Sequence, residues 1–541
     1  MTPRSSNSLA RPCATLLAIA WIGLVTACGG GGGSSPNGNT DPGLPPPTNT
    51  FAGSVTNHGA GLAGATVVAF NTNTNKTVAT ATTDASGHYS FAQLGTSCTQ
   101  SCTINYQFWV TKPGYSFEPA PARDASGYRW YASAGNWFAA SGAAVTRADY
   151  TGQFSNAGFG SAFIMTVLNF DSVANGSVSN GDFIAHDGTA ALVHLAASGQ
   201  SQSYAAGDDA GLHAGVAWPA TRYLDHHDGS VSDTLTGLTW LKDASCLAPA
   251  VWASALASVN QLASGSCGLA DGSSAGQWRL PNQWELESIV DESAASPAVT
   301  AGSPFVNVAA TAYWTSTSYF GGQSGSPQAW AIRMSDGRYV NDGVGNLKVS
   351  SSLGVWAVKG GSGGAVSLQA TGMYVPYAAG DDGSTRAGVA LPWPRVRDNA
   401  DGTLTDSLTG LVWLKRADCV SGDWSSAVAA VRGLASGQCG LSDGSSAGAW
   451  RMPNRKEMAS LADRALNNQA DFFDTAWTSA QTGIASTATV FDNFVTLQYY
   501  WTSTTDAADT SAAWTVFSCD YGVYDTPKSA TGYTLAVRDP G

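Results

Sequence analysis

Residues 228–242 read DGSVSDTLTGLTWLK, and residues 401–415 read DGTLTDSLTGLVWLK. An Asp-Gly pair within an alternating apolar pattern indicates a β-hairpin turn, and the later Thr-Gly pair marks a second turn before a strand that carries a Trp. Three further matches are YAAGDD at 204–209 and 377–382, WRLPN at 278–282 with WRMPN at 450–454, and YWTST at 313–317 and 500–504. A repeat of this length predicts a duplicated domain and not a solenoid unit.

Each copy also predicts two helices. Apolar residues share one helical face after the Trp strand, at Trp252, Leu256, Val259 and Leu262, and again at Trp424, Val428, Val431 and Leu434. A second, shorter helix is expected to begin at Asn282 and at Asn454, because each Asn stands three residues before a Glu, as a capping box requires. The rest of each copy consists of short segments typical of strands.

These motifs resemble the Lcl-type C-terminal domain family, a group of bacterial extracellular domains. The resemblance covers residues 203–360 and 374–541. It implies two C-type-lectin-like α+β domains, and named members of the family are surface adhesins that bind glycans or other polymers. Residues 361–373 are rich in Gly, which predicts a flexible linker between the two copies.

The region before the repeat has a different character. GLAGATVV at 61–68, TDASGHYSF at 83–91 and KPGYSF at 112–117 resemble the carboxypeptidase-regulatory-like domain over residues 51–155. The resemblance implies a transthyretin-like β-sandwich that serves as a spacer or binding module. Residues 156–202 remain an unassigned connector, and the fold class expected for the whole chain is mainly β with α+β.

The amino terminus has the pattern of an export signal. Arg4 and Arg11 precede an apolar run that ends at Cys28, too short for a membrane span. The sequence LVTAC resembles a bacterial lipobox, which implies a signal peptide over 1–27, lipid attachment at Cys28 and an outer-membrane location. The alternative is an ordinary cleavage site beside a chance Cys. Residues 28–50 are rich in Gly and Pro and predict a flexible tether.

Cysteine usage agrees with export. In an oxidising compartment the neighbouring and matching cysteines predict three local disulfides, with Cys519 left over. The expected pairs are Cys98–Cys102, Cys246–Cys267 and Cys419–Cys439.

Composition excludes several classes of protein. Only 12% of the 541 residues are charged, whereas 43% are hydrophobic and 19 are Trp, which disfavours general disorder and a coiled coil. The formal net charge of −13 disfavours a nucleic-acid partner.

Clustered aspartates are candidate calcium ligands. Three carboxylates surround each Asp-Gly turn, and calcium favours such hard oxygen ligands. The candidates are Asp225, Asp228 and Asp233, with Asp398, Asp401 and Asp406 in the second copy. The alternative is that these side chains bond the backbone of their own turns. Asp208–Asp209 and Asp381–Asp382 either add ligands or lie in solvated turns.

Four tryptophans, two near the end of each copy, are candidate ligand-binding residues. Exposed rings of Trp314, Trp330, Trp501 and Trp514 could stack on sugars, and the alternative is that they belong to the core.

A hydrolase is the weakest interpretation. GSSAG at 272–276 and 444–448 matches a nucleophile-elbow pattern, but no His follows either Ser274 or Ser446 in the chain. His226–His227 is absent from the second copy, so an exposed turn is favoured over a metal or pH-sensing site.

The sequence therefore predicts a lipid-anchored surface protein without catalytic activity. Its expected role is binding or adhesion to an extracellular glycan or protein polymer, with two linked copies allowing avidity. The rivals are a structural envelope protein without a glycan ligand and a cryptic secreted hydrolase.

Overall fold

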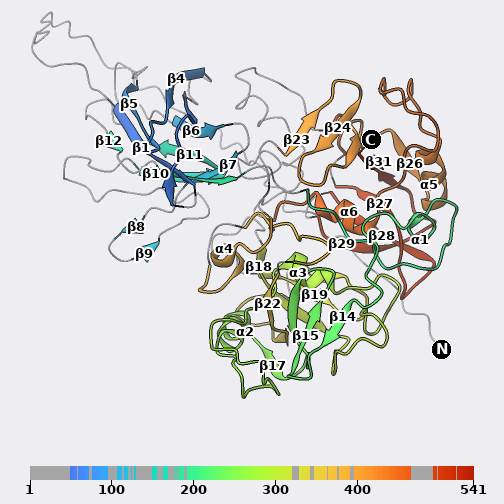
Figure 1. The fold of residues 1–541 in the computed structure, drawn as a ribbon. Helices are drawn as coiled ribbons and strands as arrows, with labels where there is room; N and C mark the ends of the chain where they lie inside the picture. The colour runs from blue at the N-terminus through green and yellow to red at the C-terminus, as the bar shows by residue number, and fades with distance from the viewer. Residues whose placement is uncertain are drawn as a thin grey trace, which may run out of the picture.

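The computed structural model shows a β-sandwich followed by two similar α+β repeats (Figure 1). It describes residues 49–57, 59–71, 76–94, 106–112, 115–119, 123–124, 127–128, 149–154, 163–168, 177–178, 182–187, 192–319, 328–340, 346–361, 363–373, 377–389, 391, 395–464, 491–495, 497–518 and 521–540. The chain is mainly β, as predicted. Within these residues, no helix combines the length and apolar character that a membrane crossing requires.

The sandwich consists of two sheets. One sheet has the path β12-β1-β13-β7 with β2 and β5 also paired to β1, and the other has the order β10-β11-β6-β3-β4. Its strands are β1 (Asn49–Asn57), β2 (Ala60–Gly61), β3 (Thr66–Asn71), β4 (Lys76–Thr82), β5 (His88–Leu94), β6 (Tyr106–Thr111), β7 (Tyr115–Pro119), β10 (Asp149–Phe154), β11 (Phe163–Leu168), β12 (Ser177–Val178) and β13 (Phe183–Asp187). A separate hairpin pairs β8 (Arg123–Asp124) with β9 (Gly127–Tyr128).

The sandwich extends beyond the boundary expected at residue 155. Strand β13 pairs in parallel with β1 and antiparallel with β7, so it is an inner strand of its sheet. Phe183 of β13 is fully buried in the same core as Phe51 and Phe108. The described strands of 156–202 thus belong to the sandwich: β12 and β13 pair with β1, which lies far away in the sequence, and β11 pairs with β10 and β6.

Repeat one contains two sheets and two main helices. The sheets have the orders β14-β15-β16-β22 and β17-β21-β18-β19-β20. The elements are β14 (Tyr223–Asp225), β15 (Ser230–Asp233), β16 (Leu238–Leu241), β17 (Leu247–Ala250), α2 (Trp252–Asn260), α3 (Gln283–Ser288), β18 (Ala312–Tyr319), β19 (Gln328–Arg333), β20 (Tyr339–Val340), β21 (Leu353–Val355) and β22 (Val358–Gly360).

Repeat two has the same topology. Its sheets have the orders β23-β24-β25-β31 and β26-β30-β27-β28-β29. The elements are β23 (Val396–Asp398), β24 (Thr403–Asp406), β25 (Val412–Leu414), β26 (Val420–Gly422), α5 (Trp424–Arg432), α6 (Arg455–Ser460), β27 (Tyr499–Thr505), β28 (Ala512–Phe517), β29 (Val523–Pro527), β30 (Gly532–Thr534) and β31 (Val537–Arg538).

The predicted hairpins and helices are present in both repeats. Gly229 adopts a φ of 85°, and an added Cβ would lie 2.4 Å from the Gly268 carbonyl oxygen, so the Asp-Gly turn requires glycine. Helices α3 and α6 each begin with a complete capping box, formed by Asn282 with Glu285 and by Asn454 with Glu457.

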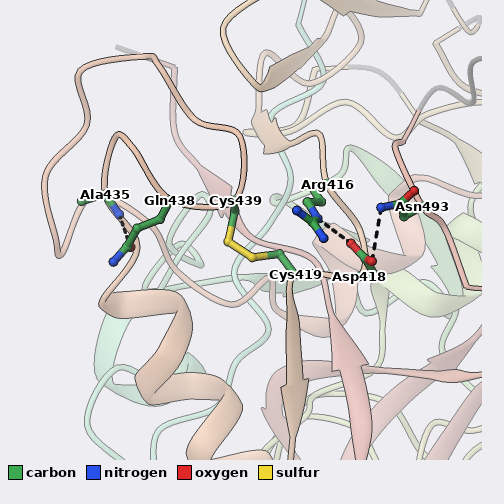
Figure 2. Close-up of a disulfide and its surroundings, with 7 residues drawn as sticks. All are labelled: Arg416, Asp418, Cys419, Ala435, Gln438, Cys439 and Asn493. Carbon is green, nitrogen blue, oxygen red and sulfur yellow. Dashed lines mark hydrogen bonds and ion pairs between the residues drawn. A yellow bond between two sulfur atoms is a disulfide. The ribbon is translucent and has the colours of Figure 1, made fainter.

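In each repeat a disulfide joins the residue before β17 or β26 to the loop that follows α2 or α5. Cys246–Cys267 and Cys419–Cys439 have Cα–Cα distances of 5.7 and 5.8 Å. Figure 2 shows the second pair, where Cys419 precedes β26 and Cys439 lies in the loop after α5. Beside it, Arg416 Nε donates to Asp418 Oδ1 at 2.8 Å.

The segments before each repeat pack on the other repeat. Short helix α1 (Asp209–Leu212) precedes repeat one in the chain but packs against β27 of repeat two, and α4 (Asp382–Thr385) packs against β18 of repeat one. Figure 1 shows both placements, with green α1 near the orange and red strands of repeat two. We call residues 192–218 and the described residues of 363–391 (363–373, 377–389 and 391) the exchanged segments.

The expected flexible linker is packed against repeat one. Val366 is buried, and its N–H donates to the Leu235 carbonyl oxygen at 2.8 Å. At the equivalent place in repeat two, the N–H of Val193 donates to the Leu408 carbonyl oxygen at 2.8 Å. The prediction of a free linker was therefore wrong, because these polar and Gly-rich residues find backbone partners on the folded repeats.

Candidate functional site

The candidate site lies where the exchanged segments meet the repeats. Thr504 Oγ1 of repeat two donates to Asp209 Oδ2 at 2.5 Å, and Thr317 Oγ1 of repeat one donates to Asp382 Oδ2 at 2.7 Å. Both aspartates are buried. The second Asp of each repeated DD pair is therefore a contact between halves of the molecule.

Burial changes the protonation of these two carboxyl groups. Desolvation raises the pKa of Asp209 to about 6, opposed by hydrogen bonds from Thr504 and Ser198, and nearby Glu457 raises it further. Desolvation raises the pKa of Asp382 to about 7, opposed by hydrogen bonds from Thr371 and Thr317. Both groups therefore keep protons more readily than an exposed Asp does.

A lysine lies between two aromatic rings at each junction. The ammonium of Lys348 lies 4.1 Å from the ring centre of Trp252 and 4.5 Å from that of Tyr377. In the matching arrangement, Lys528 lies 4.2 Å from Trp424 and 4.4 Å from Tyr204. Each Tyr opens a YAAGDD motif, so cation–π contacts help to hold each exchanged segment on its repeat.

A cavity of about 260 Å³ opens between the first exchanged segment and repeat two. Its lining residues are His194, Leu195, Gly215, Val216, Thr409, Leu411, Glu457, Asp539 and Pro540. It is slightly smaller than the roughly 300–1,000 Å³ pockets that hold drug-sized ligands, so one sugar ring or one amino-acid side chain is the appropriate size.

The polar lining of this cavity is acidic. Arg451 holds both carboxylates in place, because Nη1 donates to Glu457 Oε2 at 2.6 Å and Nη2 donates to Asp539 Oδ1 at 2.7 Å. His194 is exposed, whereas Glu457 is buried. Carboxylate oxygens and an imidazole can bond hydroxyl or ammonium groups.

A smaller cavity of about 60 Å³ adjoins the same junction. It is lined by both exchanged segments and by Trp284 and Glu287 of α3 with Lys456 and Ser460 of α6. Burial lowers the pKa of Lys456 to about 8, and the positive charge of Arg222 lowers it further. His194 and Leu195 line both cavities, and of the two His194 is exposed.

The six aspartates predicted as calcium ligands do not converge. Asp233 and Asp406 are buried and accept bonds from the guanidinium groups of Arg222 and Arg395. Asp225 and Asp398 pair with Lys242 and Lys415. Asp228 and Asp401 accept bonds from Ser230 and Thr403 in their own turns. Among the described residues no group of three potential ligands surrounds a common point.

The four tryptophans predicted to bind ligand are core residues. Trp314, Trp330, Trp501 and Trp514 are each at most 2% exposed. Arg464 lies 4.3 Å from the ring centre of Trp330, and Arg455 lies 4.5 Å from that of Trp514, so cations of the protein occupy these ring faces. The sugar-stacking prediction was wrong, because a cystine-bonded domain of this size uses its large aromatics to fill its core.

Other candidate motifs lie in exposed turns. Ser274 and Ser446 are exposed, and in the described part of the chain no histidine bonds to either hydroxyl. His226 and His227 are also exposed, and His226 Nε2 lies 2.7 Å from Ser232 Oγ. Residues 1–48, with Cys28, and the cysteines Cys98, Cys102 and Cys519 lie outside the described residues.

Comparison with known families agrees with the duplicated architecture. The model of the Lcl C-terminal domain matches residues 229–359 and again residues 402–538, and that of the carboxypeptidase regulatory-like domain matches residues 50–116. The chain carries two Lcl C-terminal domains behind a carboxypeptidase regulatory-like domain. A comparison with curated proteins gives no match. This set of domains indicates an extracellular or surface protein.

The matched ranges of the two Lcl domains begin after the exchanged segments. The sequence did show YAAGDD twice, but the motif was interpreted as a turn or an extra ligand pair. His194, Thr409, Glu457 and Asp539 were not predicted as site residues. The one signal in the sequence was that YAAGDD occurs unchanged in both copies, although it lies before the Asp-Gly hairpin. An unchanged motif at the same place in both copies indicates a structural role for these segments.

Proposed function

We propose that this protein is a lipid-anchored binding protein of the bacterial outer surface, without catalytic activity. Its ligand is an extracellular polymer, either a neutral glycan or a protein. The observation that supports this function best is the acidic cavity beside the first exchanged segment, on a chain built from two Lcl C-terminal domains. Lipid attachment at Cys28 and a C-type-lectin-like fold for each Lcl domain belong to the same proposal.

The lining of the cavity limits the ligand chemistry. Glu457 and Asp539 contribute negative charge, and the chain as a whole has a formal net charge of −13. Sulfated polymers would therefore be repelled, whereas sugar hydroxyls or the cationic groups of a protein find acceptors.

The test is binding of the purified mature chain to arrays of neutral glycans, sulfated glycans and extracellular proteins, with and without calcium. We expect binding to a neutral glycan or a protein, unchanged by a chelator. His194→Ala should weaken it by about tenfold or more, the loss expected for one good polar contact. The matched control is His88→Ala in the sandwich, whose side chain is 68% exposed, and it should leave binding unchanged.

Three outcomes separate the alternatives. Blank arrays with a correctly folded protein would favour the structural envelope protein. Binding that survives His194→Ala would place the ligand elsewhere on the surface. Turnover of a bound polymer that is lost in Ser274→Ala or Ser446→Ala would favour the hydrolase instead.

A further inference from the structure

The two repeats carry different residues at equivalent positions of their shared junction. When WRLPN at 278–282 is aligned with WRMPN at 450–454, Gln283 of α3 and Arg455 of α6 are equivalent positions of the two repeats. The same register aligns Glu292 with Arg464. Repeat one is thus acidic at a place where repeat two is basic.

Arg455 of repeat two reaches into repeat one. Its side chain is fully buried, and Nη1 donates to Glu292 Oε2 at 2.8 Å. Its Nη2 donates to the carbonyl oxygen of Gly337, also in repeat one. Two of the three guanidinium nitrogens therefore donate to acceptors that repeat one supplies.

Arg464 of repeat two also contacts repeat one. Its guanidinium carbon lies 5.0 Å from the ring centre of Trp284 and 4.3 Å from that of Trp330. Both rings belong to repeat one, and Arg464 itself is 1% exposed. A second ion pair across the junction joins Arg338 of repeat one to Asp525 of repeat two.

We infer that this junction is a heterotypic interaction surface, whose partner is the unlike repeat of the same chain. If two copies of repeat two paired in this geometry, Arg464 would stand where Glu292 stands, and it would face a buried Arg455. If two copies of repeat one paired, Glu292 would face Gln283 and lose its cation. The first arrangement would bring two buried cations together, and the second would take from Glu292 the cation that its buried carboxyl group faces, so both are destabilising.

The exchanged segments make this pairing reciprocal. The amide of Asn282 donates to the Ala387 carbonyl oxygen at 3.0 Å, and that of Asn454 donates to the Ala214 carbonyl oxygen at 3.2 Å. Each repeat thus holds the segment that precedes the other repeat. The chain closes on itself as a pair of unlike repeats, and a second copy is not required.

The test is a charge exchange in the full mature chain. Glu292→Arg and Arg455→Glu are made singly and together, and the control is Arg416→Glu, which breaks a surface ion pair with Asp418 away from the junction. The readouts are the melting temperature of the repeats and the mass in solution by light scattering. Each single variant should lower the melting temperature by more than about 5 °C, and the double variant should recover at least about half of that loss. The control should shift it by less than about 2 °C.

The milder pair Glu292→Gln and Arg455→Gln covers the case in which a reversed charge prevents folding. We expect the double Gln variant to be less damaged than the sum of the two singles, because each single leaves one buried charge without its partner. The wild-type chain should have the mass of a monomer. Additive losses in both series, or a wild-type mass of two chains, would overturn the inference.

Discussion

Asp382 shows how one residue links an exchanged segment to the stability of the whole unit. Its carboxylate accepts hydrogen bonds from the hydroxyl groups of Thr317 and Thr371 at 2.7 and 2.6 Å. Two hydroxyl donors compensate a buried negative charge less well than a guanidinium group would. The raised pKa of about 7 reflects this incomplete compensation.

The stability of the repeats should therefore decrease as pH rises from about 4 to about 7 through Asp382. The folded state holds its proton up to about pH 7, whereas the unfolded chain loses it near 3.8, so the folded state binds more protons within this window. Asp382→Asn resembles the protonated acid and should flatten the slope by about 1 kcal/mol per pH unit. Urea unfolding between pH 4.5 and 8 measures the slope. The control, Asp539→Asn, alters an exposed carboxylate and should leave the slope of stability against pH unchanged. If Asp382→Asn also left this slope unaltered, Asp382 would not be the group that causes it.

Asp233 illustrates the opposite arrangement, in which a buried carboxylate has a cation. Arg222 Nε and Nη2 donate to its two oxygens at 3.0 and 2.9 Å. Removing one partner of such a pair leaves a buried charge, so Asp233→Asn should destabilise the protein by about 3–5 kcal/mol.

Because the guanidinium group of Arg222 occupies the Asp233 carboxylate, EDTA should leave the melting temperature of the wild type unchanged. If added calcium raised the melting temperature by several degrees, the interpretation of these aspartates as calcium ligands would be supported instead.

At the scale of elements, each of the two local disulfides closes a segment that contains one strand and the first main helix of its repeat. The Cys419–Cys439 bond closes a loop with a sequence separation of 20 and fixes α5 relative to β26 (Figure 2). Its counterpart Cys246–Cys267 closes a loop with a separation of 21 in repeat one. The repeats therefore offer two matched tests of the same element.

Replacing Cys419 and Cys439 together by Ser should destabilise the protein by about 3 kcal/mol, the entropy that a loop of this length gains when it opens in the unfolded state. Chemical unfolding of oxidised wild type and of the variant measures the difference. The same change at Cys246 and Cys267 is the matched comparison and should have a similar effect. A loss below about 0.5 kcal/mol at both sites would mean that the loops are already held by their other contacts.

At the scale of the whole molecule, the two Lcl domains form one unit. Residues of both repeats belong to a single buried core, which includes Trp240 and Trp356 of repeat one with Trp413 and Trp514 of repeat two. The exchanged segments and the Arg455–Glu292 pair connect the same two halves. Ligand sites on the two repeats would therefore lie at a fixed spacing, in contrast to the independently oriented copies expected from the sequence.

This arrangement predicts that both repeats unfold in a single cooperative transition. Differential scanning calorimetry of the full chain should show one peak for the repeats, with its calorimetric and van't Hoff enthalpies in agreement. Thr504→Val removes one contact of an exchanged segment and should lower the midpoint of the entire peak. Two separate repeat transitions, only one of which responds to the substitution, would contradict the single unit.

Local sequence determined the elements of each repeat. The Asp-Gly turns, the helices that begin at Trp252 and Trp424, and the capping boxes at Asn282 and Asn454 depend on residues within a few positions of one another. Their geometry follows from backbone sterics and short-range hydrogen bonds, which any copy of the motif reproduces. The duplication and its family resemblance were visible for the same reason.

Tertiary structure alone decided which half of the molecule each segment contacts. Asp209 meets Thr504 across 295 positions of the chain, and Arg455 meets Glu292 across 163. Because the repeats are similar, the sequence pattern fits pairing within a copy as well as pairing between copies. The charge difference between Glu292 and Arg464 becomes meaningful only when the fold buries both at one junction. The same burial turned the candidate tryptophans into core residues and left His194 beside the acidic cavity.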